Sequence, residues 1–187
     1  MSGPLHGVRI WLSGAIPTEA SGKQQAAIRN FVKKFAATVF NNGGHILHGS
    51  HPSLTPILLD AAKEFGWRAG SRKDCLTLAV SRYWSKNEGV VPLQQWRERC
   101  IVYETPEATT ANAEQDSLAK LREWMSERCD VFVAVGGNWW HEVAGRTGLP
   151  IEAHLAINRA LPCFLLGGLG GVARDFVQAR PDLISRP

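Results

Sequence analysis

The sequence predicts a doubly wound α/β fold, in which a mainly parallel sheet carries helices on both of its faces. Short apolar runs alternate along the chain with longer stretches in which apolar residues recur every three or four positions. This alternation is typical of parallel strands joined by crossover helices. The 187 residues are 44% hydrophobic and 20% charged, as is ordinary for a globular domain, and we expect one domain over residues 1–187.

In the first half of the chain, the apolar segment VRIWLS predicts the first strand. The next stretch has a helical stripe that includes Ile28, Val32 and Phe35, and Gly43 can accept the left-handed backbone that ends a helix. Ser53 is suited to be the N-cap of the second helix. The first half is therefore expected to hold strands at 8–13, 45–49 and 75–80 and helices at 23–41 and 53–65.

In the second half, residues 82–95 are polar and aromatic, which predicts a loop with a short helix. The apolar stripe of the next long helix includes Leu118, Leu121 and Met125. Pro150 suits the first position of a later helix, because its fixed φ is helical and its missing N–H is not needed there. This half is expected to hold strands at 101–103, 131–135 and 163–166 and helices at 117–128, 150–159 and 172–178.

Ligands of open parallel sheets bind at the carboxyl ends of the strands, where loops lead into helices. Three loops at such positions are rich in glycine, proline and hydroxyl residues. Glycine lets a backbone approach a ligand closely, and the N–H groups of a helix N-terminus favour an anion such as phosphate. The candidate ligand-binding residues in these loops are Ser13, Gly14, His51, Ser53, Gly136, Gly137 and Asn138.

The residues of these loops can also have purely structural roles that need no ligand. The first can be a tight turn, and His51 and Ser53 can cap their own helix. Gly136 and Gly137 directly follow the most apolar strand, so they remove side chains where a ligand would lie. A branched side chain at Gly137 is accordingly expected to block a ligand and to leave the fold largely intact. No G-x-x-x-x-G-K-[ST] motif occurs, and no G-x-G-x-x-G motif opens the first helix.

Glu152 is the sharpest single candidate, because it lies in the first turn of a helix beside the expected strand ends. Three roles fit it: stabilising its helix dipole, accepting hydrogen bonds from ribose hydroxyls, or acting as nucleophile or base at an anomeric carbon. Arg82 follows the third strand with two aromatic residues and is a further candidate for ligand contact. Trp139 and Trp140 can stack on a base or form a lid or an interface.

Composition and charge limit the function classes. The net charge of +4 is mild and suits an anionic small molecule at least as well as nucleic acid, which makes a nucleic-acid partner the weaker expectation. The four cysteines are widely separated, so we expect buried thiols and neither a metal nor another cofactor. The missing G-x-S-x-G motif gives no support to a serine hydrolase. Neither a membrane span nor a signal peptide is recognisable, so we expect a cytoplasmic protein.

Three segments of the chain resemble a known family. They are the strand end I-W-L-S-G, the strand and loop I-L-H-G-S-H-P-S-L-T-P, and V-F-V-A-V-G-G-N followed after a gap by G-L-P-I-E-A-H-L-A. Together they resemble the SLOG superfamily, the Rossmann-like group that includes the DNA-processing proteins and the Lonely Guy phosphoribohydrolases. In those enzymes the last segment is P-G-G-x-G-T-x-x-E, onto which Gly136, Gly137 and Glu152 can be placed.

The chain departs from the enzyme pattern, since residues 139–146 separate Gly137 from the segment that holds Glu152, and Val135 replaces the preceding proline. The second segment looks more like the SLOG domains of antiphage systems, which implies a non-catalytic sensor for nucleotide-derived signals, including cyclic ADP-ribose species. The loops would then hold phosphates and Glu152 the ribose. The alternative is an N-glycosidase of nucleoside phosphates with Glu152 as catalytic carboxylate. A DNA-binding module is a third interpretation.

The resemblance also implies partners. SLOG relatives commonly assemble, and the chain has seven tryptophans, more than a small core readily buries. We therefore expect a homo-oligomer, with an effector domain or effector protein as a further partner.

Overall fold

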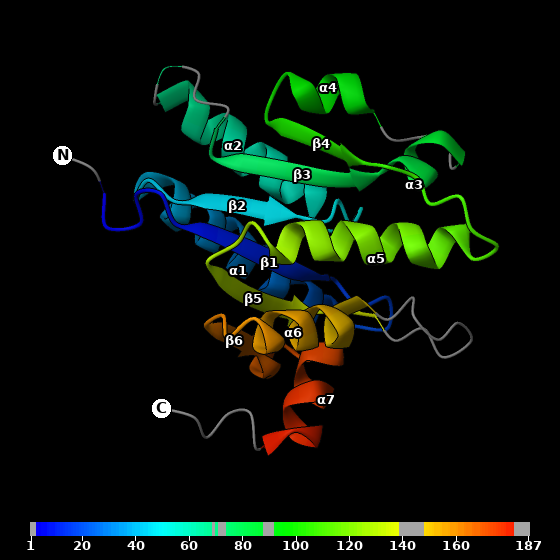
Figure 1. The fold of residues 1–187 in the computed structure, drawn as a ribbon. Helices are drawn as coiled ribbons and strands as arrows, with labels where there is room; N and C mark the ends of the chain where they lie inside the picture. The colour runs from blue at the N-terminus through cyan, green and yellow to red at the C-terminus, as the bar shows by residue number, and fades with distance from the viewer. Residues whose placement is uncertain (1–2, 69, 71–73, 88–91, 139–147, 182–187) are drawn as a thin grey trace.

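The six strands of the described chain form one parallel sheet in the order β4-β3-β2-β1-β5-β6 (Figure 1). The computed structural model describes residues 3–68, 70, 74–87, 92–138 and 148–181. The strands are β1 (Arg9–Ala15), β2 (His45–His48), β3 (Leu76–Ser81), β4 (Ile101–Thr105), β5 (Val131–Gly136) and β6 (Cys163–Leu166). The predicted α/β class with a parallel sheet is thereby confirmed.

Helices cover both faces of the sheet. One face carries α1 (Gly22–Asn41) and α2 (Thr55–Arg68), which pack against each other (Figure 1). The other face carries α5 (Ala113–Ser126) and α6 (Gly148–Asn158), and α7 (Gly171–Ala179) shares their apolar core. The short helices are α3 (Arg82–Asn87), α4 (Leu93–Arg97) and the 3-10 turn η1 (Gly167–Leu169).

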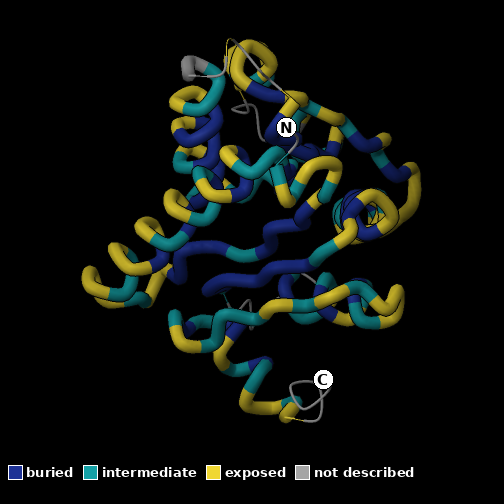
Figure 2. Tube along the Cα trace, turned by 90° about the vertical axis from the view of Figure 1, so that its left-hand side faces the viewer, coloured by how far each residue is buried: buried dark blue, intermediate teal, exposed yellow. Residues whose placement is uncertain are grey.

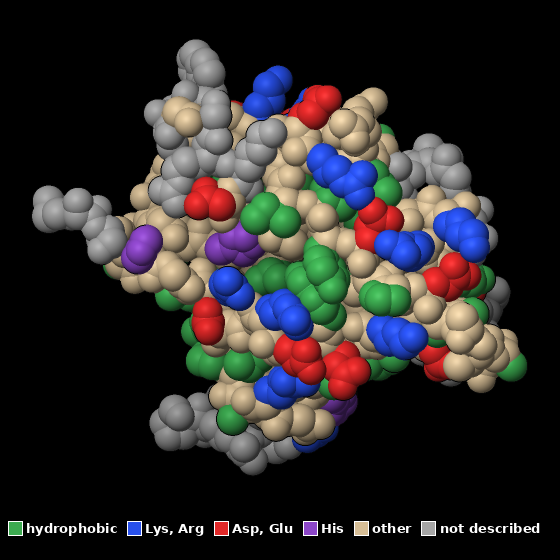
Figure 3. Space-filling view, turned by 45° about the horizontal axis from the view of Figure 1, so that its top comes forward, with side chains coloured by type: hydrophobic (Ala, Val, Ile, Leu, Met, Phe, Trp, Pro, Cys, Tyr) green, Lys and Arg blue, Asp and Glu red, His purple; other side chains and the backbone are tan. Residues whose placement is uncertain are grey.

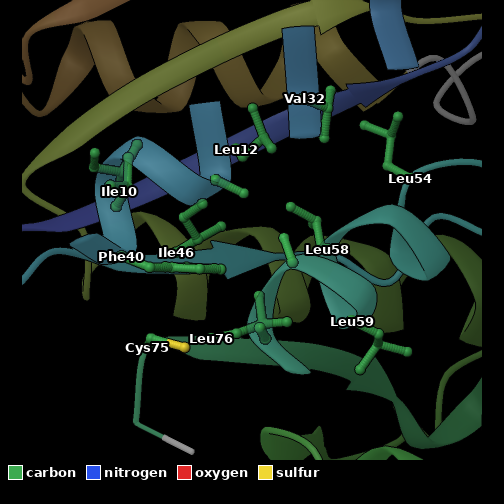
Figure 4. Close-up of a cluster of buried hydrophobic side chains, with 14 of the residues drawn as sticks. Ile10, Leu12, Val32, Phe40, Ile46, Leu54, Leu58, Leu59, Cys75 and Leu76 are labelled. Carbon is green, nitrogen blue, oxygen red and sulfur yellow. The ribbon is translucent and has the colours of Figure 1, made fainter. Parts of the chain in front are cut away.

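Two apolar cores follow from the alternation of side chains along the strands. Leu12 of β1 packs with residues of α1 and α2, whereas the neighbouring Trp11 packs with those of α5, α6 and α7. Figure 4 shows Leu12 and Ile46 in the first core with Leu58 of α2. The four inner strands β1, β2, β3 and β5 are the most continuously buried part of the described chain (Figure 2). This burial on both faces explains their apolar sequences.

Some expected boundaries differ from the structure. The second helix begins at Thr55, so Ser53 is not its N-cap. Helix α5 begins at Ala113, four residues before the expected start at residue 117, and residues 82–97 hold two short helices. Three of the four cysteines are buried, as expected, whereas Cys163 is only partly buried. Burial raises the pKa of the Cys100 thiol to about 12. No helix of the described residues is long and apolar enough to cross a membrane.

The strand order creates a crevice between β1 and β5. After β1 the chain adds β2, β3 and β4 on one side, and it then returns to place β5 on the other side of β1. The loops that leave β1 and β5 therefore run toward opposite sides of the sheet. Such a switch point is where open parallel sheets bind ligands.

Candidate functional site

A cavity of about 550 Å³ opens at the carboxyl ends of the strands and includes this switch point. Its walls come from the strand ends of β1, β2 and β3, the loop after β5, and helices α3, α4, α5 and α6. The volume lies within the range of about 300–1,000 Å³ that is common for small-molecule sites.

Glu152 of α6 is held between a serine and an arginine in this cavity. The Ser13 hydroxyl donates to Oε2 of Glu152, and Nε of Arg122 donates to Oε1 at 3.3 Å. The Arg122 side chain is 8% exposed and that of Glu152 is 16% exposed, so water screens this ion pair little. Each carboxylate oxygen can accept a second hydrogen bond. The group can therefore still bind hydroxyls of a ligand.

A glycine makes space for this ion pair. A Cβ atom at Gly148 would lie 2.9 Å from Oε1 of Glu152 and 3.0 Å from Nη2 of Arg122. Both distances are shorter than ordinary van der Waals contacts to carbon. Any larger residue at position 148 would therefore displace the pair.

A short relay of hydrogen bonds orients His51 in the loop between β2 and α2. The N–H of Ile16 donates to the Ser53 hydroxyl at 2.9 Å, and this hydroxyl lies 2.9 Å from Nδ1 of His51. The N–H of Ser53 also donates to Nδ1 at 3.3 Å. Burial and the nearby His48 lower the pKa of His51 to about 4. His51 is thus neutral near pH 7 and accepts at Nδ1, so its proton is on Nε2.

His48 has the opposite tautomer. Its Nδ1 lies 2.9 Å from the carbonyl oxygen of Leu12, so Nδ1 carries the proton and Nε2 has the free electron pair. Burial lowers the pKa of His48, while the backbone of Leu12 and His51 and the charge of Glu152 oppose that shift. Burial is the largest of these effects, and the ring is neutral at neutral pH.

The packing of the fold itself requires glycine at three positions near the switch point. Gly14 has φ +127°, and a Cβ there would overlap the carbonyl oxygen of Val135 in the paired strand. Gly136 has φ +61°, and its Cβ would overlap the carbonyl oxygen of Ala15. A Cβ at Gly137, at φ +92°, would lie 3.1 Å from Leu149 Cδ1 and 3.2 Å from Val172 Cβ. A side chain at Gly137 would thus enter the apolar core, so the expectation that it would leave the fold largely intact is wrong.

The structure brings most of the candidate residues to one cavity. Those that line it are Ser13, Gly14, His51, Gly137, Asn138 and Glu152. Asn138 also accepts hydrogen bonds at Oδ1 from the N–H of Thr18 at 2.8 Å and from its hydroxyl at 3.1 Å, which ties the loop after β1 to the loop after β5.

Three candidates are not among the lining residues. The Ser53 hydroxyl contacts the ring of His51, which itself lines the cavity, and Gly136 pairs with Ala15 within the sheet. Arg82 is exposed at the start of α3. Trp139 and Trp140 lie outside the described residues.

The sequence analysis did not predict Arg122 and His48 as site residues, although each is a polar residue in an apolar pattern. Arg122 occupies a position on the apolar stripe of its helix, one turn after Leu118 and one turn before Met125. His48 ends a short apolar strand. A charged or polar residue on an otherwise apolar face indicates a partner supplied by another part of the chain.

Solved structures of low sequence identity have a similar fold. The protein TM1055 superposes with a TM-score of 0.61 at 17% identity, over 91% of this chain and 81% of that chain. DNA processing protein A from Streptococcus pneumoniae has a TM-score of 0.58 at 12% identity, over 92% of this chain and 56% of that chain. This chain thus spans little more than half of the pneumococcal protein.

A second DNA processing protein A is also similar. The protein from Helicobacter pylori, whose structure concerns its single-stranded DNA binding mode, has a TM-score of 0.54 at 14% identity, over 95% of this chain and 81% of that chain. No curated protein matches the sequence. The model of the family SLOG cluster2 matches residues 85–182, a segment that runs from α3 to the end of α7 and includes Arg122 and Glu152. Since this match spans more than half of the sequence, the chain belongs to the SLOG cluster2 family.

Proposed function

We propose that this protein binds a nucleotide or an ADP-ribose-derived molecule at the carboxyl edge of its sheet. The observation that carries this proposal is the shielded Ser13–Glu152–Arg122 group in a cavity of about 550 Å³ at the β1–β5 switch point. Doubly wound sheets bind nucleotides at such points. Family membership supports ligand binding in general.

Within this proposal, Glu152 accepts hydrogen bonds from the ribose hydroxyls. A carboxylate accepts only, so it matches a diol that can donate from both of its oxygens. Ser13 and Arg122 each engage one carboxylate oxygen, which fixes the carboxylate plane before a ligand arrives. Such preorganisation reduces the entropy lost on binding.

The alternative is an N-glycosidase in which Glu152 stabilises positive charge at the anomeric carbon. The shielded position of Glu152 favours this chemistry, because electrostatic stabilisation is strong where water is excluded. The contact with Arg122 disfavours it, since the guanidinium balances the negative charge that an oxocarbenium ion would need. Binding without turnover is therefore the first proposal.

The biological role that we propose is a sensor in an antiphage-type system, with a cyclic ADP-ribose species as the signal and an effector domain or protein as the recipient. The resemblance of the loop after β2 to such domains supports this role. Binding of DNA has less support. On the face shown in Figure 3, basic and acidic side chains are interspersed, whereas nucleic-acid sites usually gather basic ones.

A thermal-shift panel with chromatography of the same samples tests the proposal. The probes are AMP, ADP-ribose, a cyclic ADP-ribose and a single-stranded oligonucleotide. A ligand that binds the folded state raises Tm according to RT ln(1 + [L]/Kd). We expect at least one nucleotide to raise Tm and no free base to be released. Release of free base would favour the glycosidase, and a shift with the oligonucleotide alone would favour the DNA-binding module.

A further inference from the structure

The floor of the cavity contains buried polar atoms that the described chain leaves unpaired. They are Nε1 of Trp11, Nε2 of His48 and the hydroxyl of Ser81. All three residues line the cavity, Trp11 from within β1 and the other two from the carboxyl ends of β2 and β3. Each of the three residues is at most 1% exposed. Most buried polar groups in native proteins are paired, because an unpaired one is destabilising. This part of the cavity is therefore suited to a polar partner.

The Nε2 atoms of the two histidines at this floor have opposite hydrogen-bonding roles, since one accepts and the other donates. His48 uses its Nδ1 proton on the carbonyl oxygen of Leu12, so Nε2 can only accept. His51 accepts from Ser53 at Nδ1, so Nε2 can only donate. The indole of Trp11 adds a second donor. A partner at this end must thus offer both a donor and an acceptor.

This requirement excludes the phosphate of a nucleotide, and both its ribose hydroxyls and its base meet it. Phosphate oxygens only accept at neutral pH, so a phosphate would leave Nε2 of His48 unpaired. A nucleobase such as adenine presents a donor and an acceptor side by side on one edge. The cavity walls at this end include Trp84, Trp96 and Leu118, and such apolar walls suit the flat faces of a heterocycle.

We propose that the β2–β3 end of the cavity is a nucleobase subsite, in which His48 accepts from the base and His51 donates to it. This inference rests on the proposed function, because it takes the ribose to lie at Glu152. Ser53 is a positioning residue, since its hydroxyl, oriented by the N–H of Ile16, fixes the tautomer of His51. The expectation that His51 and Ser53 hold a phosphate is replaced by this role.

Binding of small probes tests the subsite from the ligand side. Calorimetry would compare ribose 5-phosphate, the four ribonucleoside monophosphates, and purine riboside 5′-monophosphate, which lacks the exocyclic amine of AMP. We expect at least one monophosphate to bind about tenfold more tightly than ribose 5-phosphate, and purine riboside monophosphate to bind more weakly than AMP. If no monophosphate binds more tightly than ribose 5-phosphate, the nucleobase subsite is overturned and the proposed function is not. The same holds if purine riboside monophosphate binds as tightly as AMP. No binding of any of these probes, together with no thermal shift by ADP-ribose or a cyclic ADP-ribose, overturns the proposed function with it.

Two variants test it from the protein side. S81A removes an unpaired buried hydroxyl, so we expect an unchanged or higher Tm and a several-fold weaker affinity for the best monophosphate. S53A is expected to weaken that affinity about tenfold, and S53T, which keeps the hydroxyl, to restore it. Neither variant should change the affinity for ribose 5-phosphate.

A matched control is S117A, because Ser117 is a buried serine whose hydroxyl accepts from the N–H of Ala108 at 2.8 Å and which does not line the cavity. It should lower Tm without changing the affinity of any probe. Equal losses for ribose 5-phosphate and the monophosphate in S81A and S53A would overturn the subsite. Unchanged affinities in both variants would overturn it as well.

Discussion

At the scale of single residues, Glu152 distinguishes binding from catalysis. Glu152→Gln keeps a carbonyl acceptor but removes the charge, so nucleotide affinity should fall by about 1.5–3 kcal/mol, the range for hydrogen bonds to a charged group. Titration calorimetry with the best nucleotide of the panel measures this loss. Wild-type protein that releases free base, and a Glu152→Gln variant that still binds but no longer does so, would contradict the sensor proposal.

Glu152→Gln is also expected to lower the stability of the fold, and a second variant separates this effect from the loss of affinity. Glu152→Gln takes a carboxylate partner away from the positive charge of the shielded Arg122 guanidinium, and losing one half of a buried ion pair is strongly destabilising. Adding Arg122→Gln removes that charge. We expect the double variant to recover stability in urea unfolding without recovering affinity. Recovery of affinity would mean that Glu152 acts on binding only through the fold.

His51 predicts how stability depends on pH. Its pKa is about 4 in the folded protein and about 6.5 in the unfolded chain, so the unfolded chain takes up the proton first as the pH falls. The contribution of His51 is complete above about pH 6.5 and decreases as the pH falls toward about 4. Near pH 5 the loss should be about 2 kcal/mol.

Urea unfolding of the wild type and of His51→Gln at several pH values between about 4 and 7.5 measures this contribution. The variant should lose stability less steeply below about pH 6.5. It should keep some of the dependence, because burial also lowers the pKa of His45 and His48. Identical slopes in the two proteins would show that His51 is protonated alike in the folded and unfolded states.

At the scale of elements, the pairing of β1 with β5 depends on glycine. Gly14→Ala should lower the free energy of unfolding by about 3 kcal/mol or more, because the Cβ would overlap the Val135 carbonyl and the backbone has φ +127°. Gly168→Ala is the matched control, since nothing lies within 4 Å of a Cβ there, and it should change stability by less than about 0.5 kcal/mol. A stable Gly14→Ala variant would contradict the close approach of the two strands.

At the scale of the whole molecule, self-association remains a prediction, and the structure adds a second reason for it. Trp11 is buried, and Trp84, Trp96 and Trp124 are partly buried, so these four tryptophans expose no large apolar surface. The exposed apolar side chains lie elsewhere. Phe164 on the edge strand β6 is 60% exposed, the highest value among the exposed large hydrophobic residues of the described chain.

Edge strands that expose apolar side chains can pair with other chains. Light scattering at tens of micromolar protein should therefore detect a dimer or a larger oligomer, and Phe164→Ser should shift it toward the monomer. Tyr103→Ser, on the opposite edge strand β4, serves as the comparison. A monomeric wild-type protein would remove the prediction, and an effect of Tyr103→Ser alone would move the interface to the other edge.

The amino-acid sequence predicts most elements of this protein and the edge of the sheet where its candidate site lies. Apolar periodicity is a local property, so the strands and the long helices could be located within a few residues. The carboxyl ends of parallel strands meet at one edge of the sheet, so the sequence predicts that Ser13, His51 and Glu152 lie near one another.

Which of these residues contact one another depends on the tertiary structure. Glu152 meets Ser13 and Arg122, which are 139 and 30 positions away along the chain, and no local pattern encodes those distances. Likewise Ser53 orients His51 because the N–H of Ile16 reaches its hydroxyl from another loop. Local periodicity reports burial and chain direction, whereas hydrogen-bond partners depend on how separate elements pack, and that packing is a property of the whole fold.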